Sequence, residues 1–274
     1  MKIGMRAHDF GRREPHELAR MIKDAGFETV QLALTKAVAG VNSFADIDAP
    51  LLEKVRRGFD DNAVDIGVLG CYVEIGLPDK QARLNEVDKF LGGLEHAKIL
   101  GVNLAGTETT NFPPDLGSER ESAYQNLKDS VLRMAERAEK LGVDIGIETV
   151  ADHTLNSAEL TRRLLDEVNS KRLKVIFDPV NLILTQYDIN NQEQLFGNFL
   201  EVVGADIAAL HVKDIVLTGS EKIWRNIGAG DIRYLPIFKW LTTHRPDIPA
   251  LREHVKPESF KIDIEAMKNL STIN

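Results

Sequence analysis

The feature that most constrains the fold is a series of apolar runs that each end in an acidic residue or a histidine. Four such runs end at Glu148, Asp178, His211 and Glu253. The separations of 30, 33 and 42 residues along the numbering each match about one strand followed by one helix. The sequence therefore predicts four successive strand–helix units whose strands end in chemically active side chains.

The same alternation runs through the rest of the chain. Apolar segments predict eight strands, at residues 2–7, 29–34, 65–72, 102–105, 143–150, 173–178, 207–212 and 248–253. Three- and four-residue apolar spacing predicts the intervening helices, at residues 14–25, from 50 onward, and at 79–100, 119–141, 157–168, 191–203, 235–243 and 257–270. Between residues 212 and 235 we expect a long loop, broken by the segment Gly228-Ala229-Gly230-Asp231.

Eight strand–helix alternations without a linker predict one domain of the α/β class. Alternating strands and helices form a parallel sheet with right-handed crossovers, and eight units close naturally into a (β/α)8 TIM barrel. The 274 residues fit such a barrel, which typically takes ~250, so we expect one domain over residues 1–274. A doubly wound open sheet is the alternative, but no G-x-G-x-x-G follows the first strand, and the late Gly228-x-Gly230 lacks the third glycine.

Composition narrows the setting in which such a barrel would work. No apolar run reaches the ~20 residues of a membrane span, and no charged-then-apolar leader precedes the first strand. The single cysteine, Cys71, excludes an internal disulfide framework and fits a reducing compartment. A net charge of −8 argues against general affinity for nucleic acid. We therefore expect a cytoplasmic protein with neither membrane nor nucleic acid as a partner.

The four strand ends predict a metal site. The C-terminal ends of barrel strands share one face, so Glu148, Asp178, His211 and Glu253 should converge. A single acid at a strand end is more often a loop acid or a helix cap, and it is the recurrence that favours ligands. Three carboxylates and an imidazole would repel one another without a cation. Oxygen and nitrogen ligands suit one divalent ion of Mn, Mg, Co, Fe or Zn, and the lack of thiolates argues against structural zinc.

Further polar residues near the strand ends are candidates for contacting a substrate. They are His8, Tyr72, His153, Asn181, Lys213 and Asp214. Four of them have a plainer alternative: the two histidines as ordinary loop residues, Lys213 as a solvated cation, and Asp214 as a partner of His211 or a cap. Glu74 and Glu108 either line the mouth of the barrel or face water. Cys71 is more consistent with core packing than with a nucleophile.

Five segments together resemble a known superfamily. They are Ile147-Glu148-Thr149, Phe177-Asp178-Pro179-Val180-Asn181, Leu210-His211-Val212-Lys213-Asp214, Asn226-Ile227-Gly228-Ala229-Gly230-Asp231 and Glu253-His254. In this order they resemble the xylose-isomerase-like barrels, within them the sugar phosphate isomerase/epimerase group, over nearly the whole chain. The resemblance implies one divalent metal held by the four strand-end residues. It also implies that Glu148 and Glu253 move protons on opposite faces of the carbon next to a carbonyl, and that a dimer or tetramer is common.

The resemblance indicates a reaction class and leaves several members of it open. Return of the proton to the other face gives epimerisation, return to the neighbouring carbon gives aldose–ketose isomerisation, and loss of a β-hydroxyl gives dehydration, as in the inosose dehydratases. A non-catalytic sugar- or metal-binding barrel is an alternative of another class. The substrate is expected to be a small sugar or polyol.

The chain departs from its relatives at positions that bear on the substrate. Ketose 3-epimerases of the superfamily carry His, Glu and Arg where this chain has Asn181, Thr154 and Leu217. The ligand set of the related endonucleases is largely missing, so DNA repair is not expected. Arg252, which precedes Glu253 in an otherwise apolar strand, is expected either to point outward or to bind an anionic group of the substrate.

Overall fold

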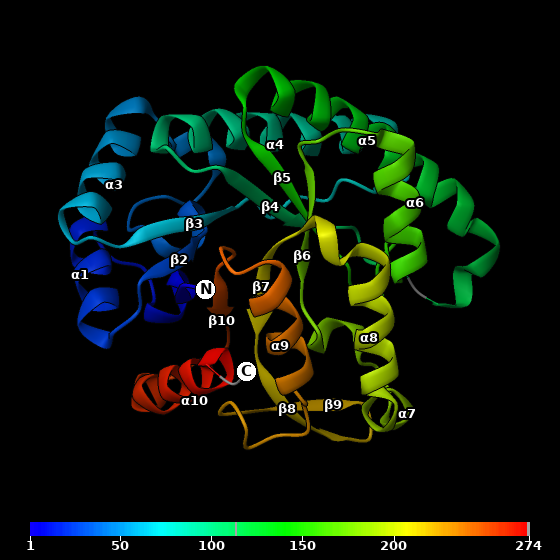
Figure 1. Ribbon diagram of the computed structural model, residues 1–274. Coiled ribbons are helices and arrows are strands. Elements are labelled where there is room, and N and C mark those ends of the chain that lie inside the picture. The colour runs from blue at the N-terminus through cyan, green and yellow to red at the C-terminus, as the bar shows by residue number, and fades with distance from the viewer. Residues whose placement is uncertain (113, 273–274) are drawn as a thin grey trace.

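Eight parallel strands form a closed barrel in the computed structural model, which describes residues 1–112 and 114–272 (Figure 1). The strands are β1 (Ile3–Arg6), β2 (Thr29–Leu32), β3 (Asp65–Gly70), β4 (Leu104–Glu108), β5 (Asp144–Glu148), β6 (Leu173–Phe177), β7 (Ile207–Val212) and β10 (Ala250–Arg252). Their order around the barrel is β1-β10-β7-β6-β5-β4-β3-β2, and pairing of β1 with both β10 and β2 closes it. The predicted (β/α)8 barrel is confirmed.

Helices follow the strands and surround the barrel (Figure 1). The longer ones are α1 (Pro15–Ala25), α3 (Ala49–Asp61), α4 (Lys80–Leu100), α5 (Arg120–Leu141), α6 (Ala158–Val168), α8 (Gln192–Val203), α9 (Leu235–His244) and α10 (Phe260–Thr272), and α2 (Leu34–Ala37) and α7 (Gln186–Asn190) are short. Asp48, Asp79 and Ser157 cap three N-termini by accepting backbone N–H bonds, because the first turn of a helix has no internal acceptors. Within the described residues, every helix is too short or too polar to cross a membrane.

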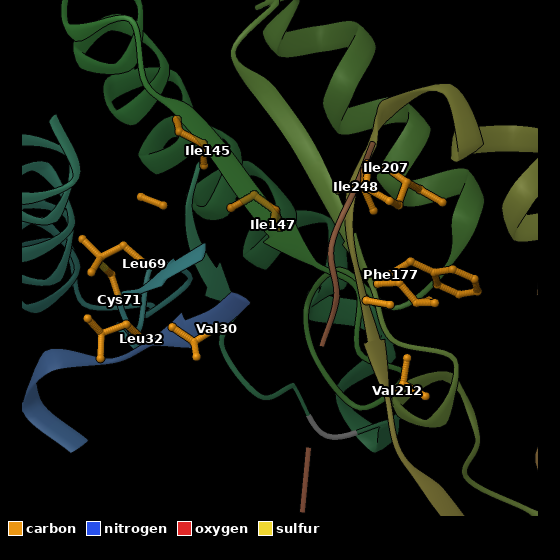
Figure 2. Close-up of a cluster of buried hydrophobic side chains, with 14 of the residues drawn as sticks. Val30, Leu32, Leu69, Cys71, Ile145, Ile147, Phe177, Ile207, Val212 and Ile248 are labelled. Carbon is orange, nitrogen blue, oxygen red and sulfur yellow. The ribbon is translucent and has the colours of Figure 1, made fainter. Parts of the chain in front are cut away.

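The hydrophobic core has two layers, because successive strand residues point to opposite faces of the barrel wall. One face packs against the helices and forms the large outer layer, part of which is labelled in Figure 2. The other face fills the barrel with a smaller cluster of Val68, Leu104, Ile176, Ala209 and Leu251. Cys71 belongs to the outer layer, and burial raises its pKa to about 12, which agrees with core packing and not with a nucleophile.

The same alternation fixes which residues emerge at the C-terminal end of the barrel. Phe177 points outward and stacks on Phe199 of α8, with ring centroids 4.6 Å apart. Its neighbours Ile176 and Asp178 therefore share the inner side, Ile176 in the inner cluster and Asp178 one layer above it. The sequence predicted the fourth strand correctly, but the predicted bounds, residues 102–105, were wrong. That strand is β4, and it continues to Glu108, which pairs with Glu148.

The expected long loop after β7 contains an antiparallel hairpin that the sequence did not reveal. Strands β8 (Asp214–Thr218) and β9 (Glu221–Arg225) pair over their full length, outside the ring of barrel strands (Figure 1). Gly219 turns the chain between them with a φ of 65°, a conformation that glycine adopts without strain. The prediction of a plain loop was wrong because the two strands are short and charged residues, among them Glu221, Lys222 and Arg225, interrupt their apolar pattern.

Arg252 points outward from β10 and forms a buried ion pair with α10. Its Nε lies 2.8 Å from Asp263 Oδ2, and both side chains are almost fully buried. The guanidinium also donates to the backbone carbonyls of Glu253 and Arg225, and Asp263 accepts from the backbone N–H of Ile227. Of the two possibilities left open by the sequence, the outward orientation is confirmed, and the charge is satisfied within the protein.

We expect Asp263→Ala to destabilise the protein by about 3–5 kcal/mol, because it leaves a buried guanidinium without its counter-ion. Chemical denaturation followed by circular dichroism measures the loss. The double variant Arg252→Met/Asp263→Leu should recover much of it. The control is Glu136→Ala, which breaks the exposed pair with Lys140 on α5 and should have little effect, because water screens charges at the surface. Equal losses at Asp263 and Glu136 would contradict a buried ion pair.

Candidate metal centre

Three carboxylates surround one ring nitrogen at the C-terminal end of the barrel. His211 Nδ1 lies 3.2 Å from Glu148 Oε2, 3.5 Å from Glu253 Oε1 and 3.8 Å from Asp178 Oδ2. The four residues come from β5, β6, β7 and β10, which are neighbours in the barrel. All four side chains are buried. The structure thus brings together the four strand-end residues that the sequence singled out.

The histidine is held with Nδ1 aimed at the carboxylates. Its Nε2 lies 2.6 Å from Gln31 Oε1 of β2, and because an amide oxygen only accepts, this contact places a proton on Nε2. Gln31 is held in turn, since its Nε2 donates to the Tyr72 hydroxyl at 2.9 Å. In the neutral ring Nδ1 then carries a lone pair, as a metal ligand requires. This nitrogen is buried and has no hydrogen-bond partner in the described part of the chain.

Asp178 is oriented in a similar way by its own loop. Its Oδ1 accepts backbone N–H bonds from Val180 at 2.9 Å and Asn181 at 3.2 Å. This turn leaves Oδ2 facing the centre of the site, where it is buried and lies 2.7 Å from Lys213 Nζ. Pro179 and the short 3-10 turn that follow Asp178 therefore hold its carboxylate in a fixed orientation.

The donor set fits a divalent cation. Ligand atoms ~2.1 Å from a common ion lie roughly 3.0–3.4 Å apart, close to the separations around His211 Nδ1. One oxygen or nitrogen from each of Glu148, Asp178 and His211 lies within 4.8 Å of the others. Glu253 Oε1 approaches the same nitrogen from β10. His211 Nδ1, a buried nitrogen without a hydrogen-bond partner among the described residues, and the three carboxylates around it therefore form a donor set that fits a divalent cation.

Charge in the site is unbalanced towards the negative. Burial opposes a charged ring, but the carboxylates of Glu253 and Glu148 outweigh it and raise the pKa of His211 to about 9. Burial alone would also raise the pKa of Glu253, yet Lys213, His211 and Arg6 hold that pKa well below its usual range. The site therefore attracts positive charge, whether as a proton or as a metal ion.

Lys213 and Arg6 supply part of that charge. Lys213 Nζ lies 2.7 Å from Asp178 Oδ2 and 3.1 Å from Glu253 Oε2, and the side chain is almost fully buried. Arg6 Nη1 lies 3.6 Å from the same Glu253 oxygen, while its other nitrogens donate to Asp9. Lys213 is thus a component of the site and not a solvated cation.

The predicted substrate residues fall into two groups. His8, Tyr72 and Asn181 border the site: His8 and Tyr72 meet edge to face with centroids 6.3 Å apart, and Asn181 Nδ2 donates to Glu148 Oε1. Burial, Arg6 and Lys36 lower the pKa of His8 to about 4, so its ring is neutral at neutral pH. His153 lies in the loop after β5, bridged to Asn111, with Nδ1 buried and unpartnered within the described residues.

Asp214 stabilises the loop that follows the hairpin. Its carboxylate accepts backbone N–H bonds from Ile215, Gly228, Gly230 and Ile232. A Cβ at Gly230 would lie 2.3 Å from Asp214 Oδ1, so only glycine allows this close approach. Of the alternatives open from the sequence, the structure gives Asp214 the role of a cap and holds it away from His211.

Two more acids were left open at neighbouring strand ends. Glu108, at the end of β4, is half-buried, and burial followed by the carboxylate of Glu148 raises its pKa to about 7. It therefore lines the mouth. Glu74 is exposed to water. Sequence reasoning did not single out Gln31, although a polar residue two positions after Thr29 in an apolar strand marks the inner face of the barrel.

A separate cleft opens at the opposite end of the barrel. It encloses about 500 Å³ and is lined by residues at the N-terminal ends of the strands, among them Asp65, Leu104 and Asp144. In TIM-barrel enzymes the chemistry sits at the C-terminal ends of the strands, whereas the other end serves stability. The cleft also lacks the convergent, oriented ligand atoms found around His211. We therefore place the candidate site at the carboxylate cluster.

Comparison with known proteins agrees with this fold. Residues 19–270 match the family model described as xylose isomerase-like TIM barrel. Among curated proteins, the chain is 27% identical over 216 residues to a probable endonuclease 4 of Campylobacter concisus, a match that covers 72% of each protein.

Solved structures share the whole architecture. The 3-keto-D-glucoside 4-epimerase YcjR of E. coli, in its apo form, superposes with a TM-score of 0.76 at 17% identity, covering 100% of both chains. The IOLI protein, whose structure contains a zinc atom, superposes with a TM-score of 0.76 at 15% identity, covering 99% of this chain and 98% of that one. At these identities the likeness establishes the fold alone.

We expect Asp178→Asn and His211→Ala to lose bound metal without unfolding, because each removes an oriented ligand atom. Elemental analysis should find about one divalent ion per chain in the wild type and a small fraction of that in both variants. His244→Ala changes a histidine on the outside of α9 and serves as the matched control. Unchanged metal content in both site variants would rule out this ligand set.

Gln31→Leu should weaken metal binding by roughly 10–100-fold, because it frees the His211 ring from the contact that fixes its tautomer. Titration of the metal-free protein by calorimetry measures the change. Gln31→Glu keeps an acceptor for Nε2–H and should bind metal better than Gln31→Leu. If Gln31→Leu binds as tightly as the wild type, then Gln31 does not orient the ligand.

Proposed function

The chain belongs to the xylose isomerase-like TIM barrel family, and from this premise we propose that it is a divalent-metal-dependent isomerase or epimerase of a sugar or a related polyhydroxy carbonyl compound. The observation that carries the proposal is the pair of carboxylates, Glu148 and Glu253, on the outer strands of the four-strand arc that holds His211. Two carboxylates that face one buried point from different strands can serve both sides of a bound substrate.

In this proposal Glu148, Asp178, His211 and Glu253 hold one divalent ion. When bound, the ion supplies Lewis-acid polarisation of a substrate carbonyl and so acidifies the C–H bond beside it. Oxygen-rich donors with one imidazole suit Mn²⁺, Mg²⁺, Co²⁺, Fe²⁺ or Zn²⁺. The zinc atom in the structure of the IOLI protein supports a metal in this fold, though the identity of the ion in this chain is open.

The two glutamates would carry the proton. Glu253 is ionised in the resting protein because Lys213, His211 and Arg6 outweigh its burial and hold its pKa low, so it can accept a proton. Glu148 receives a hydrogen bond from Asn181 on one oxygen and faces His211 with the other, which fixes its position. One carboxylate removes the proton next to the carbonyl and keeps it, and the other, in its protonated form, donates its own proton to the opposite face or to the neighbouring carbon.

The remaining polar groups would hold the substrate. Lys213 presents a buried ammonium between Asp178 and Glu253, and such a charge stabilises negative charge that develops on a substrate oxygen. His8, Tyr72, His153 and Asn181 are the proposed partners of the substrate hydroxyls. Asp214 is left out of this set because its carboxylate is occupied by four backbone N–H groups.

The endonuclease relative raises a competing function that the site does not favour. Within residues 1–112 and 114–272, Glu148, Asp178 and His211 form the one group of three or more close potential ligands. The resemblance to the superfamily implies that its endonucleases use further histidine and aspartate ligands for three zinc ions. A single buried group and a net charge of −8 favour a small-molecule substrate over a nucleic acid.

Solvent-deuterium exchange tests the proposal. The metal-loaded protein in ²H₂O should replace the proton next to the carbonyl of at least one compound among pentoses, hexoses, their phosphates and inososes, as followed by proton NMR. Epimerisation, isomerisation and dehydration then differ in the product spectrum. Exchange with none of these compounds would argue against an enzyme and favour a barrel that only binds.

Glu148→Gln and Glu253→Gln should each lower the exchange rate per bound metal ion by roughly 10²–10⁴-fold, because each removes a group that carries the proton. Metal content is measured in the same samples, so that loss of the ion is separated from loss of the base. Glu136→Gln, on the exposed side of α5, is the control. A variant that keeps both its metal and its full exchange rate would exclude that glutamate from proton transfer.

A further inference from the structure

The hairpin after β7 turns one of its faces towards the mouth of the barrel. In the antiparallel pair, Ile215 lies opposite Trp224 and Leu217 opposite Lys222, so these four side chains share a face. Ile215 and Leu217 are buried, and Lys222 Nζ donates to the carbonyl of Val180 in the loop after β6. This face therefore packs onto the barrel end and is tied to the loop that carries Asp178.

Trp224 differs from its neighbours on that face because it remains exposed. Its exposed fraction is 39%, although Ile215 directly opposite is fully buried. The ring lies 5.9 Å from Lys213 Nζ, which itself contacts Asp178 and Glu253. An aromatic ring that stays partly open to solvent on this face is available to a ligand. Its neighbour Lys213 places the ring beside the carboxylate cluster.

The ring of Trp224 is braced from behind by His254. The two rings are stacked nearly parallel, with centroids 3.8 Å apart and an interplanar angle of 8°. His254 follows Glu253 directly and has a φ of 53°, in the left-handed region that a non-glycine residue seldom adopts. The chain thus leaves β10 in a strained conformation that delivers Glu253 to the site and His254 to the tryptophan.

We propose that Trp224, braced by His254, is the platform on which the apolar face of a sugar or cyclitol ring stacks while its carbonyl is held at the carboxylate cluster. This assignment rests on the proposed function and names the substrate class more closely, as a ring-shaped polyol. A ring of this kind has C–H groups on its faces and hydroxyls around its edge. The C–H groups can pack against the face of the indole ring. The Lys213 ammonium can donate hydrogen bonds to the hydroxyls, and the carboxylates beside it can accept hydrogen bonds from them.

The chain contains a matched control for this pair. Its second tryptophan, Trp240, also stacks on a histidine, His244, with centroids 4.4 Å apart. That stack lies within α9, on the outside of the barrel, where Trp240 packs over Gly204. Trp240→Phe therefore removes the same chemistry away from the mouth, and it leaves Trp224 as the one remaining indole, whose fluorescence then reports on the platform.

The experiment uses the metal-loaded full-length protein in the Trp240→Phe background. The ring probes are 2-keto-myo-inositol and D-fructose, which is largely cyclic in water, and the controls are glycerol and Mg²⁺ alone. Ring probes should change Trp224 fluorescence saturably, and the controls should not. Trp224→Ala should weaken ring-probe binding by calorimetry roughly tenfold, whereas Trp224→Phe, which keeps a flat ring, should stay close to the wild type.

A kinetic measurement separates this proposal from the proposed function. For any probe that exchanges deuterium, Trp224→Ala should raise KM about tenfold and leave kcat nearly unchanged, because stacking holds the substrate without touching the reacting carbon. Exchange in the wild type with an unaltered KM in Trp224→Ala would overturn the platform alone. Saturable binding at Trp224 without exchange would overturn the proposed function alone. Failure of every ring probe to change the fluorescence would also overturn the platform.

Discussion

Burial of three carboxylates around one nitrogen is the constraint on which the rest of the site depends. Glu148, Asp178 and Glu253 all face His211 Nδ1 within 3.8 Å, and all three side chains are buried. Like charges at such distances are tolerated only when a cation or a proton lies among them. The surrounding contacts are arranged accordingly: Gln31 fixes the ring, the loop N–H groups fix Asp178, and Lys213 bridges two of the acids.

The barrel meets this constraint through the two-residue repeat of its strands. Each of the four site residues lies two positions after a residue that points into the barrel. Glu148 follows Gly146 of β5, Asp178 follows Ile176 of β6, His211 follows Ala209 of β7, and Glu253 follows Leu251 of β10. The other four strands contribute polar residues at the same height: Arg6 two after Gly4, Gln31 two after Thr29, Tyr72 two after Gly70 and Glu108 two after Gly106. The site is therefore the uppermost layer of the barrel interior, with an apolar layer beneath it that keeps water out.

This repeat also explains what the sequence could and could not predict. The four ligand candidates stood out because each ends an apolar run, and the alternation of runs and periodic segments was enough to predict the barrel. Gln31 went unnoticed because it lies inside a strand, although its position two after Thr29 marks it as inward. Arg252 was ambiguous until the structure showed the outward parity that pairs it with Asp263. The position of Trp224 could not be predicted, because it is set by the pairing of two short hairpin strands whose register no local sequence pattern determines.

The same charges that would hold a metal also govern the state of the site without one. Lys213 carries one positive charge for two carboxylates, and Arg6 is shared with Asp9, so negative charge remains in excess. Without a metal ion, the carboxylates favour a proton on His211 and raise the pKa of its ring to about 9. A protonated Nδ1 has no lone pair for a ligand bond, so a metal ion and a proton compete for one position. A substrate that becomes anionic during reaction adds to the excess negative charge. A proton on His211 adds one positive charge, whereas a divalent ion would add two and would offset more of the excess negative charge. The charge balance of the cluster therefore favours chemistry with a metal ion over chemistry without one.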